Sequence, residues 1–556
     1  MGDNTTVINP AAFSASGDVI RTIDSGGVKT QVVALSGQTD NGNLVSVPVT
    51  HEGHLEVAIH EPITPFGSLM TETTEPVFQF DAVYGLVNSE ISTTTGHLTG
   101  GVTSATVTSA NNLFTCSTGT TALSFSTLHS RRRLRYKAGQ GVVGRFSALF
   151  SDPAANSILV AGFGTAEAGF FFGYNGTSFG ILHSTGGVRE IQTLTVTTAS
   201  TSTQPYQVTI NGVSHNVTAT NNGSTVKTAF EIANGTYTGW DAQQIGSTVI
   251  FVANSAGVKA GSFGLAQSGA GTPAAGSYVE TLAGAAATDT WYPQTEWNGD
   301  KLDGTGSSGF TLDPSKGNVF QIGIQYLGFG AVTFKVEVTT ENANNPTFIT
   351  AHVLNFPNTR TTPHISQPSF PFTMAAYSAG SSTDVSVSVG SVGGFLVGKR
   401  KSLGPRLSYR RQTNGFVGST ASTYYPLFTI KNKLVFSGRP NQSVIKLISV
   451  SASTDDATPV SFLLLKNVVQ NLTGTPNFSS YATSSCAAYD ASAATVTITD
   501  NTQLIFSFEL GQTSGQTYAF ADELFLEPGE SWTLAAAAVS GTATYVNASL
   551  VTREDQ

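Results

Sequence analysis

Oxygen-bearing side chains gather in one glycine-rich stretch of the sequence, EWNGDKLDGTGSSGFTLD. Asn298, Asp300 and Asp303 lie close to Gly304, and Asp313 follows further along. Carboxylate and amide oxygens on a glycine-rich loop are the ligands that calcium prefers. The order D-x-D-x-D-G is not met, and Asx side chains that brace turns account for the same residues. We keep Asn298, Asp300 and Asp303 as a calcium candidate and favour the turn interpretation.

Three histidines, His51, His54 and His60, lie near the N-terminus. The segment HLEVAIHEP alternates apolar and polar residues, which places His54 and His60 on one face of a predicted strand. In a trimer these two side chains could converge on a metal ion, but their spacing matches no standard zinc site. We therefore predict that His54 and His60 lie on a surface that contacts a partner.

The most basic run is HSRRRLRYKAG, residues 129–139. On a strand, one face would carry Arg132, Leu134 and Tyr136, and the other would carry Arg131, Arg133, Arg135 and Lys137. Such a run can bind an anionic partner. Because the whole chain is acidic, we predict contact with a subunit or another protein, through Arg131, Arg133 and Arg135, rather than with nucleic acid.

Aromatic residues are dense at Phe170, Phe171, Phe172 and Tyr174. Rings of this kind can stack on sugars. Consecutive aromatics on a strand more often fill a core on one face and an interface on the other, and we favour that interpretation. Tyr174, beside the turn Asn175-Gly176, remains a candidate for binding a partner.

The sequence has no H-E-x-x-H, phosphate-binding loop or C-x-x-C. Its G-x-S-x-G match, at residues 176–180, follows a predicted turn between two strand-like segments and so lacks the strand–turn–helix context of a nucleophile elbow. We therefore predict that the chain is not an enzyme and binds no cofactor. A glycosidase is the alternative, since its two carboxylates need only lie about 5–9.5 Å apart in space. With 36 acidic residues in the chain, a hidden pair of this kind stays open.

Composition indicates the fold class. Only 11% of the 556 residues are charged, against about 25% in ordinary proteins, while 58 are glycine. Thr, Val, Phe and Tyr favour strands, and Gly and Asn favour turns, so the sequence predicts an all-β protein of tandem β-sandwich or jelly-roll domains. The net charge of −9 argues against nucleic acid as a partner. We expect neither a secretory signal nor a membrane span, because no suitable apolar run is present.

Turn and strand patterns divide the chain into five parts. Residues 1–75 form an extended N-terminal anchoring region, and 76–192 with 288–400 form a discontinuous main β-sandwich. Residues 193–287 form a small inserted β-β-α-β module, 401–412 a basic linker, and 413–556 a C-terminal β-sandwich or jelly roll. Within the insert, Asn211-Gly212 predicts a type I′ hairpin. A helix capped by Ser224 or Thr225 is expected to follow and to end at Gly235.

Four segments of the sequence resemble a family of virion proteins from phages of aquatic bacteria and from some large DNA viruses. The matching segments are RRRLRYKAGQG, GFFFGYNGTSFGILHSTGG, WYPQTEWNGDKLDGTGSSGFTLDPSKGNVFQIGIQYLG and SVGGFLVGKR. Similarity extends over most of residues 75–556. The resemblance implies a particle protein, of the tail, fibre or minor structural type, without catalytic residues that can be carried over.

From the resemblance and the composition we expect a structural virion protein, assembled in the host cytoplasm and located in the virion. It would be a tail- or vertex-associated fibre or spike that forms a homo-oligomer, and we favour a trimer. Its partners would be other virion proteins and a glycan or protein of the host surface, with no nucleic acid and no membrane. Two alternatives are a capsid decoration or cement protein and a polysaccharide depolymerase tailspike; the absence of a 20–50-residue repeat counts against the latter.

Overall fold

The computed structural model describes most of the chain from residue 74 onward and short strands before it. The described ranges are 3–7, 18–25, 28–31, 36–38, 44–46, 74–99, 101–165, 167–338, 347–366, 368–398, 404–417, 423–455, 458–521, 524–539 and 542–555. The chain divides into two compact units, Met1–Thr71 and Glu72–Gln556. The expected all-β class is confirmed, since antiparallel sheets make up nearly all of the regular structure.

The described residues of the first unit form two small antiparallel sheets. One is three-stranded, with the order β1 (Asp3–Val7), β2 (Asp18–Ser25) and β3 (Val28–Gln31). The other pairs β4 (Ser36–Gln38) with β5 (Leu44–Ser46).

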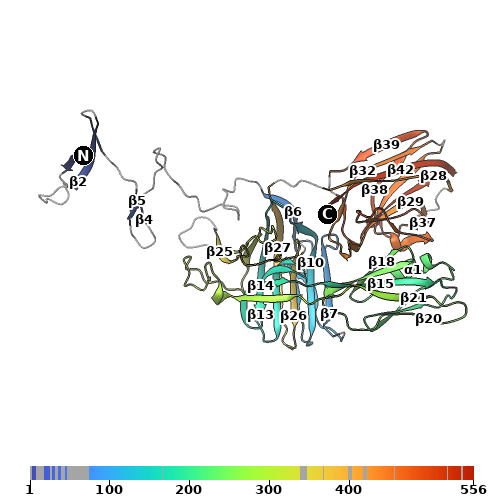
Figure 1. The fold of residues 1–556 in the computed structure, drawn as a ribbon, viewed down its shortest axis with the longest axis horizontal. Helices are drawn as coiled ribbons and strands as arrows, with labels where there is room; N and C mark the ends of the chain where they lie inside the picture. The colour runs from blue at the N-terminus through green and yellow to red at the C-terminus, as the bar shows by residue number, and fades with distance from the viewer. Residues whose placement is uncertain are drawn as a thin grey trace. The chain divides into compact units, whose positions relative to one another are not determined.

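The second unit begins with a two-sheet sandwich, the main sandwich (Figure 1). Its seven-stranded sheet has the order β22 (Thr288–Pro293), β14 (Ser178–Thr185), β13 (Gly169–Asn175), β12 (Ser157–Gly164), β26 (Ser369–Ser378), β10 (Ser124–Arg135) and β7 (Ile91–His97). Its eight-stranded sheet has the order β25 (Thr347–Leu354), β24 (Val332–Val338), β23 (Asn318–Ile324), β11 (Val142–Phe150), β27 (Ser386–Val397), β9 (Leu113–Ser117) and β8 (Thr106–Ala110), with β6 (Thr74–Asp81) also paired to β27.

Phenylalanine rings from both sheets fill the core of the main sandwich. The ring centroids of Phe172 and Phe320 lie 4.6 Å apart, and those of Phe146 and Phe372 lie 5.4 Å apart. Phe171 points away from this core and packs in a separate buried cluster on the other face of its sheet. The strand therefore buries its aromatics on both faces, and such burial is the main source of stability in a sandwich.

The inserted module lies between β14 and β22, which pair with each other, so the chain leaves and re-enters the sheet at neighbouring strands. Its first sheet has the order β18 (Trp240–Ile245), β19 (Thr248–Ala256), β15 (Arg189–Thr198) and β21 (Ala275–Leu282). Its second has the order β17 (Val213–Val217), β16 (Tyr206–Ile210) and β20 (Gly264–Gln267).

Two local predictions within the insert are confirmed. Asn211 and Gly212 join β16 to β17 with φ of 50° and 80°, the left-handed values that a type I′ turn requires. Ser224 caps α1 (Thr225–Ala233) by accepting a hydrogen bond of 3.3 Å from the backbone N–H of Lys227. None of the helices among the described residues has the length and apolar character needed to cross a membrane.

The C-terminal sandwich also has two sheets. The first has the order β28 (Arg406–Val417), β42 (Thr542–Asp555), β32 (Val444–Thr454) and β39 (Ser514–Ala519), with β40 (Phe525–Leu526) also paired to β32. The second has the order β34 (Leu472–Gly474), β37 (Ala493–Thr497), β29 (Thr423–Asn432), β41 (Ser531–Ala538), β33 (Val460–Lys466) and β38 (Leu504–Leu510), with β36 (Ala487–Asp490) on β29 and β35 (Ser479–Ser480) on β36. The short elements are β30 (Val435–Phe436), β31 (Arg439–Pro440) and the 3₁₀ helices η1 (Gln294–Glu296), η2 (Val469–Asn471) and η3 (Asn501–Gln503).

The insert packs directly on the C-terminal sandwich. Phe230 of α1 belongs to a buried cluster whose other members come from the C-terminal sandwich, including Leu465 and Phe478. The backbone N–H of Gly246 donates a 2.7 Å hydrogen bond to the carbonyl of Phe478. One side of α1 therefore packs in the core of the insert, through Ile232, and the other packs on the C-terminal sandwich, through Phe230.

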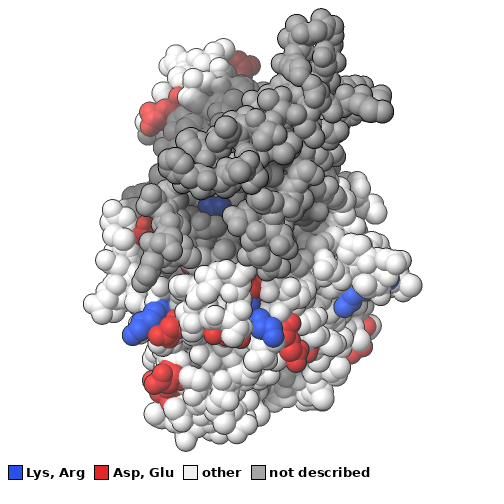
Figure 2. All heavy atoms as spheres, turned by 90° about the vertical axis from the view of Figure 1, so that its left-hand side faces the viewer, with Lys and Arg blue, Asp and Glu red and all other residues white. Residues whose placement is uncertain are grey.

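Charged side chains are sparse on the face shown in Figure 2, where most of the described surface is uncharged. Blue and red side chains often lie next to each other on this face. The described residues therefore form no strong patch of one sign on this face.

Candidate functional site

The basic run of β10 lines a pocket of about 400 Å³. The pairing of β10 with β26 shifts register between His129 and Arg133, an irregularity of the β-bulge type. As a result both Arg132 and Arg133 line the pocket. The simple alternation expected from the sequence, with Arg132 and Arg133 on opposite faces, is therefore wrong at this point, while Leu134 is fully buried in the core.

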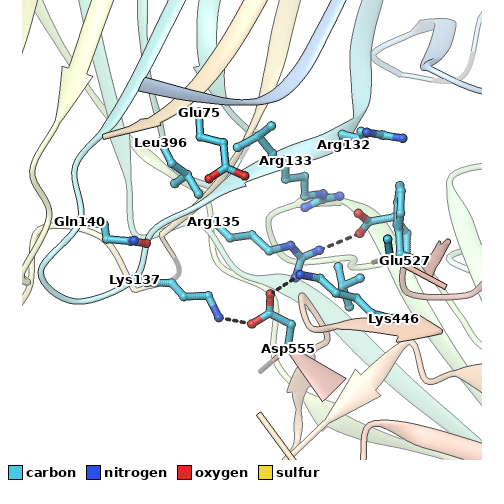
Figure 3. Close-up of a pocket in the computed structure, with 14 residues that line it drawn as sticks. Glu75, Arg132, Arg133, Arg135, Lys137, Gln140, Leu396, Lys446, Glu527 and Asp555 are labelled. Atoms are coloured by element: carbon cyan, nitrogen blue, oxygen red, sulfur yellow. Dashed lines mark hydrogen bonds and ion pairs between the residues drawn. The ribbon is translucent and has the colours of Figure 1, made fainter. Parts of the chain in front are cut away.

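Three ion pairs lie in this pocket, and two of them link the main sandwich to the C-terminal sandwich (Figure 3). Arg135 pairs with Glu527 at 2.8 Å, and Lys137 pairs with Asp555. The ammonium group of Lys446 lies 3.5 Å from the other oxygen of Asp555. These side chains are largely shielded from solvent, so their attraction is less screened than that of surface pairs.

Two arginines of the pocket form no hydrogen bond or close ion pair with a carboxylate among the described residues. The guanidinium of Arg132 lies 5.0 Å from the centroid of the Phe525 ring, in a cation–π contact. Arg133 is half-buried and points into the pocket (Figure 3). Burial lowers the pKa of Arg133 from its usual value, the charge of Glu527 opposes this shift, and the charge of Arg135 adds to it. A guanidinium held in this way can accept an anionic ligand.

A second recess, of about 380 Å³, lies on the outer face of the C-terminal sandwich. Strand pairing places one row of side chains across β28, β42, β32 and β39: Arg410, Ser549, Ser451 and Thr517. The next row is Gln412, Asn547, Ser453 and Gly515. We call these two rows the polar face. The Ser451 and Thr517 hydroxyls are 2.9 Å apart, and the Arg410 guanidinium donates to Asn547 Oδ1 at 3.4 Å.

The side-chain oxygens of the calcium candidates already accept hydrogen bonds from backbone N–H groups. Asp300 accepts hydrogen bonds from the backbone N–H groups of Leu302, at 2.8 Å, and Ser308, at 2.7 Å. Burial raises its pKa, but these hydrogen bonds outweigh that effect and lower it overall. Asp303 accepts from the N–H two residues further on, and the Asn298 side chain bonds to the backbone of β25. The described residues hold no group of three or more His, Cys, Asp or Glu side chains suited to a metal ion, and calcium binding by Asn298, Asp300 and Asp303 stays a prediction.

The remaining predicted site residues are scattered. Arg131 is exposed and lies outside the pocket that Arg133 and Arg135 line. The ring of Tyr174 is half-buried and packs 5.1 Å from that of Phe179, so part of its surface is already covered within the chain. His54 and His60 lie outside the described residues.

Sequence reasoning missed the acidic half of the pocket. Glu527 and Asp555 belong to the C-terminal sandwich and approach the arginines only after folding. No local pattern marks them: Glu527 follows β40 and Asp555 ends β42, and the residues around them give no sign of a partner on β10. The only available signal was the unusual density of arginine on β10.

Comparisons with known proteins give a fold likeness and no family. No protein-family model matches the chain, and no curated protein matches it either. Among solved structures, it is similar to a glycosyl hydrolase family protein from Mycobacterium fortuitum, with 9% identity, a TM-score of 0.25, and coverage of 58% of this chain and 99% of that one. A family 16 glycosyl hydrolase from Mycobacterium smegmatis gives 9% identity, a TM-score of 0.24, and coverage of 58% and 100%. An engineered family GH43 glycoside hydrolase gives 9% identity and a TM-score of 0.21, and the match covers 68% of this chain and 51% of that one.

These matches correct the prediction that the chain is not an enzyme. That prediction relied on the absence of short motifs, whereas the matching structures are glycoside hydrolases, a class whose catalytic carboxylates leave no short motif. At identities of 8–9% and TM-scores of 0.21–0.25, the likeness assigns no activity, substrate or catalytic residue to this chain.

Proposed function

We propose that the chain is a structural component of a virus or phage particle, a tail- or vertex-associated fibre or spike that binds other particle proteins and a glycan of the host surface. The polar face of the C-terminal sandwich is the observation that carries the proposal. The sparse charge of the chain, its resemblance to virion proteins and its sandwich architecture also support it.

The polar face suits a hydroxyl-rich ligand for three reasons. Ser and Thr hydroxyls both donate and accept hydrogen bonds, as sugar hydroxyls do. Their short side chains lose little rotamer freedom when a ligand orders them. Gly515 contributes no side chain to its row, which leaves the recess open at β39. Affinity per copy would be low, and repeated copies in one particle would raise it by avidity.

Residues 1–75 serve in this proposal as the anchor to the particle, and a homotrimer provides the repeated copies. The first unit, Met1–Thr71, is compact in itself, which supports a separate attachment role. We propose that it contacts other virion proteins.

Immunogold electron microscopy of intact particles tests the proposal. Antibody raised against residues 413–556 should label the tail or a vertex, and antibody pre-absorbed with the purified chain should label nothing. A second antibody, against residues 193–287, guards against a buried epitope. Absence of both labels from every particle would show that the chain is not a virion protein.

A capsid decoration protein is the second candidate, favoured by exposed apolar side chains in the loops on either side of β7. Tyr84 is 88% exposed and Val102 is 85% exposed, and Val83 and Leu98 accompany them. Val83 and Tyr84 adjoin in one of these loops, and exposed apolar groups that adjoin can form a protein–protein contact. Gold label spread evenly over the head would favour this candidate over the fibre or spike.

A further inference from the structure

The charged pocket has more cationic than anionic side chains. Its lining includes five cationic side chains, Arg132, Arg133, Arg135, Lys137 and Lys446, and three carboxylates, Glu75, Glu527 and Asp555. Two of the three carboxylates are engaged in the ion pairs that cross the pocket. The pocket therefore keeps a local positive charge in a chain whose net charge is −9.

Arg133 concentrates this charge at one group. It makes no hydrogen bond or ion pair with another described residue, although it is half-buried and Glu527 lines the same pocket. The charges of Glu527 and Glu167 offset the cost of removing this guanidinium from water only in part, because the pKa of Arg133 still falls. An anion bound directly at the guanidinium would offset the remainder. The arrangement is that of a binding group without its ligand.

We propose that this pocket binds a carboxylate-bearing sugar residue, such as a uronic acid, with Arg133 as the ligand of the carboxylate. The planar guanidinium matches the two oxygens of a carboxylate in a bidentate contact. Val77, Leu396 and Phe525 supply apolar surface in the same lining, which suits the C–H face of a sugar ring. The inference rests on the residues of the pocket alone and holds whether or not the chain is a particle protein.

The carboxylates and the volume of the pocket limit the charge and the size of the ligand that it can bind. Glu75, Glu527 and Asp555 limit the surplus positive charge of the pocket, which disfavours a highly charged anion such as a nucleic acid. A volume of about 400 Å³ lies at the lower end of the range for small-molecule sites, about 300–1,000 Å³, and suits one or two sugar units. A singly charged, ring-shaped ligand therefore fits best.

Isothermal titration calorimetry of the purified full chain with methyl glucuronide tests the proposal, at low ionic strength because salt weakens charge attraction. The neutral methyl glucoside and inorganic sulfate are titrated in parallel. We expect binding of the glucuronide, and binding of the glucoside and sulfate weaker by about tenfold or more. Equal affinity for glucoside, or for sulfate, would overturn the assignment to an acidic sugar, as would no binding of glucuronide at millimolar concentration.

Substitutions on β10 locate the site. Arg133→Gln should weaken glucuronide binding about tenfold or more, and Arg133→Lys, which keeps the charge but loses the planar fork, should weaken it less. Arg131→Gln, on the same strand but outside the pocket, is the matched control and should leave binding unchanged. Since no described residue pairs with Arg133, its substitution should leave the Tm within about 2 °C of the parent value. Equal binding by Arg133→Gln and the parent chain would overturn the role of Arg133.

Discussion

The guanidinium of Arg135 lies 2.8 Å from the carboxylate of Glu527, a residue 392 positions later in the chain. One belongs to β10 of the main sandwich, and the other follows β40 of the C-terminal sandwich. Their side chains are 17% and 15% exposed, so the pair is neither a surface contact nor a fully buried one. It belongs to the charged pocket, which residues of both sandwiches line.

A double-mutant cycle with Arg135→Gln and Glu527→Gln should give a coupling energy of about 1–2 kcal/mol. That value lies between the roughly 0.2–1 kcal/mol of exposed pairs and the loss of about 3–5 kcal/mol seen when one partner of a buried pair is removed. The measurement is urea unfolding of the four proteins. The pair Lys466–Glu530, at 2.9 Å and within the C-terminal sandwich, is the control and should show weaker coupling because Lys466 is more exposed. A coupling energy near zero for Arg135 and Glu527 would contradict the prediction.

Acid should destabilise the main sandwich through two buried histidines. Burial lowers the pKa of His183 to about 4, and burial together with the charge of His183 lowers that of His364 to about 3. The unfolded chain takes up protons first, at a pKa of about 6.5, so stability is full above that pH and falls as pH decreases toward 3. Neither imidazole of this pair has a partner for its Nε2 atom among the described residues, so no hydrogen bond offsets the charge.

Urea denaturation at pH 7.0 and pH 4.5 checks this expectation. The loss should amount to several kcal/mol in total, since each pH unit below about 6.5 contributes up to about 1.4 kcal/mol per histidine. His183→Phe keeps an aromatic ring against Phe170, at 5.1 Å in the parent chain, and should reduce the loss. An unchanged difference between the two pH values in this variant would exclude His183 as a cause.

Removal of the Phe230 ring should release the insert from the C-terminal sandwich. Phe230→Ala deletes a side chain that is 3% exposed and packed on C-terminal residues, at an expected cost of about 3–5 kcal/mol. Hydrogen exchange in residues 472–480 should rise. Ile232→Ala, on the same helix but in the core of the insert, should leave exchange in 472–480 unchanged. Equal exchange in both variants would contradict a specific docking role for Phe230.

The two cysteines should resist thiol reagents in the folded chain. Cys116 and Cys486 are unpaired and fully buried, one in each sandwich. Burial raises the pKa of Cys116 to about 12 and raises that of Cys486 as well, which keeps both thiols protonated. Labelling with a disulfide reagent at pH 7.5 should therefore be slow, and it should become rapid in urea. Prompt labelling of the native chain would contradict this, and Cys116→Ala and Cys486→Ala would identify the site.

The sequence was sufficient for the fold class and for local elements whose signals lie within a few residues. Thr, Val, Phe and Gly content predicted the all-β sandwiches, and Asn211-Gly212 predicted its hairpin, because turn chemistry depends only on neighbouring residues. The bulge in β10 was not predicted, since three consecutive arginines look equivalent in a strand pattern.

Only half of the charged pocket could be anticipated. Arg133 and Arg135 belong to the basic run and were selected as partner-binding residues, whereas Glu527 and Asp555 reach them through tertiary pairing that no local pattern encodes. The calcium candidate shows a different difficulty, in which a local pattern suggests a site although the same residues stabilise a turn. Asp300 has the right chemistry for a metal, but backbone N–H groups of its own turn occupy its oxygens. Motif absence proved a weak argument against an enzyme, because paired carboxylates leave no trace in sequence.

Both sandwiches pair their first strand with their last: β6 with β27, and β28 with β42. A ribosome makes the chain from the N-terminus, so neither sandwich can close until its final strand has emerged. Strands β15 to β21 of the insert lie within one short stretch and can fold while the main sandwich is still open. Synthesis therefore favours an order in which the insert folds first, the main sandwich second, and the C-terminal sandwich only when translation is nearly finished.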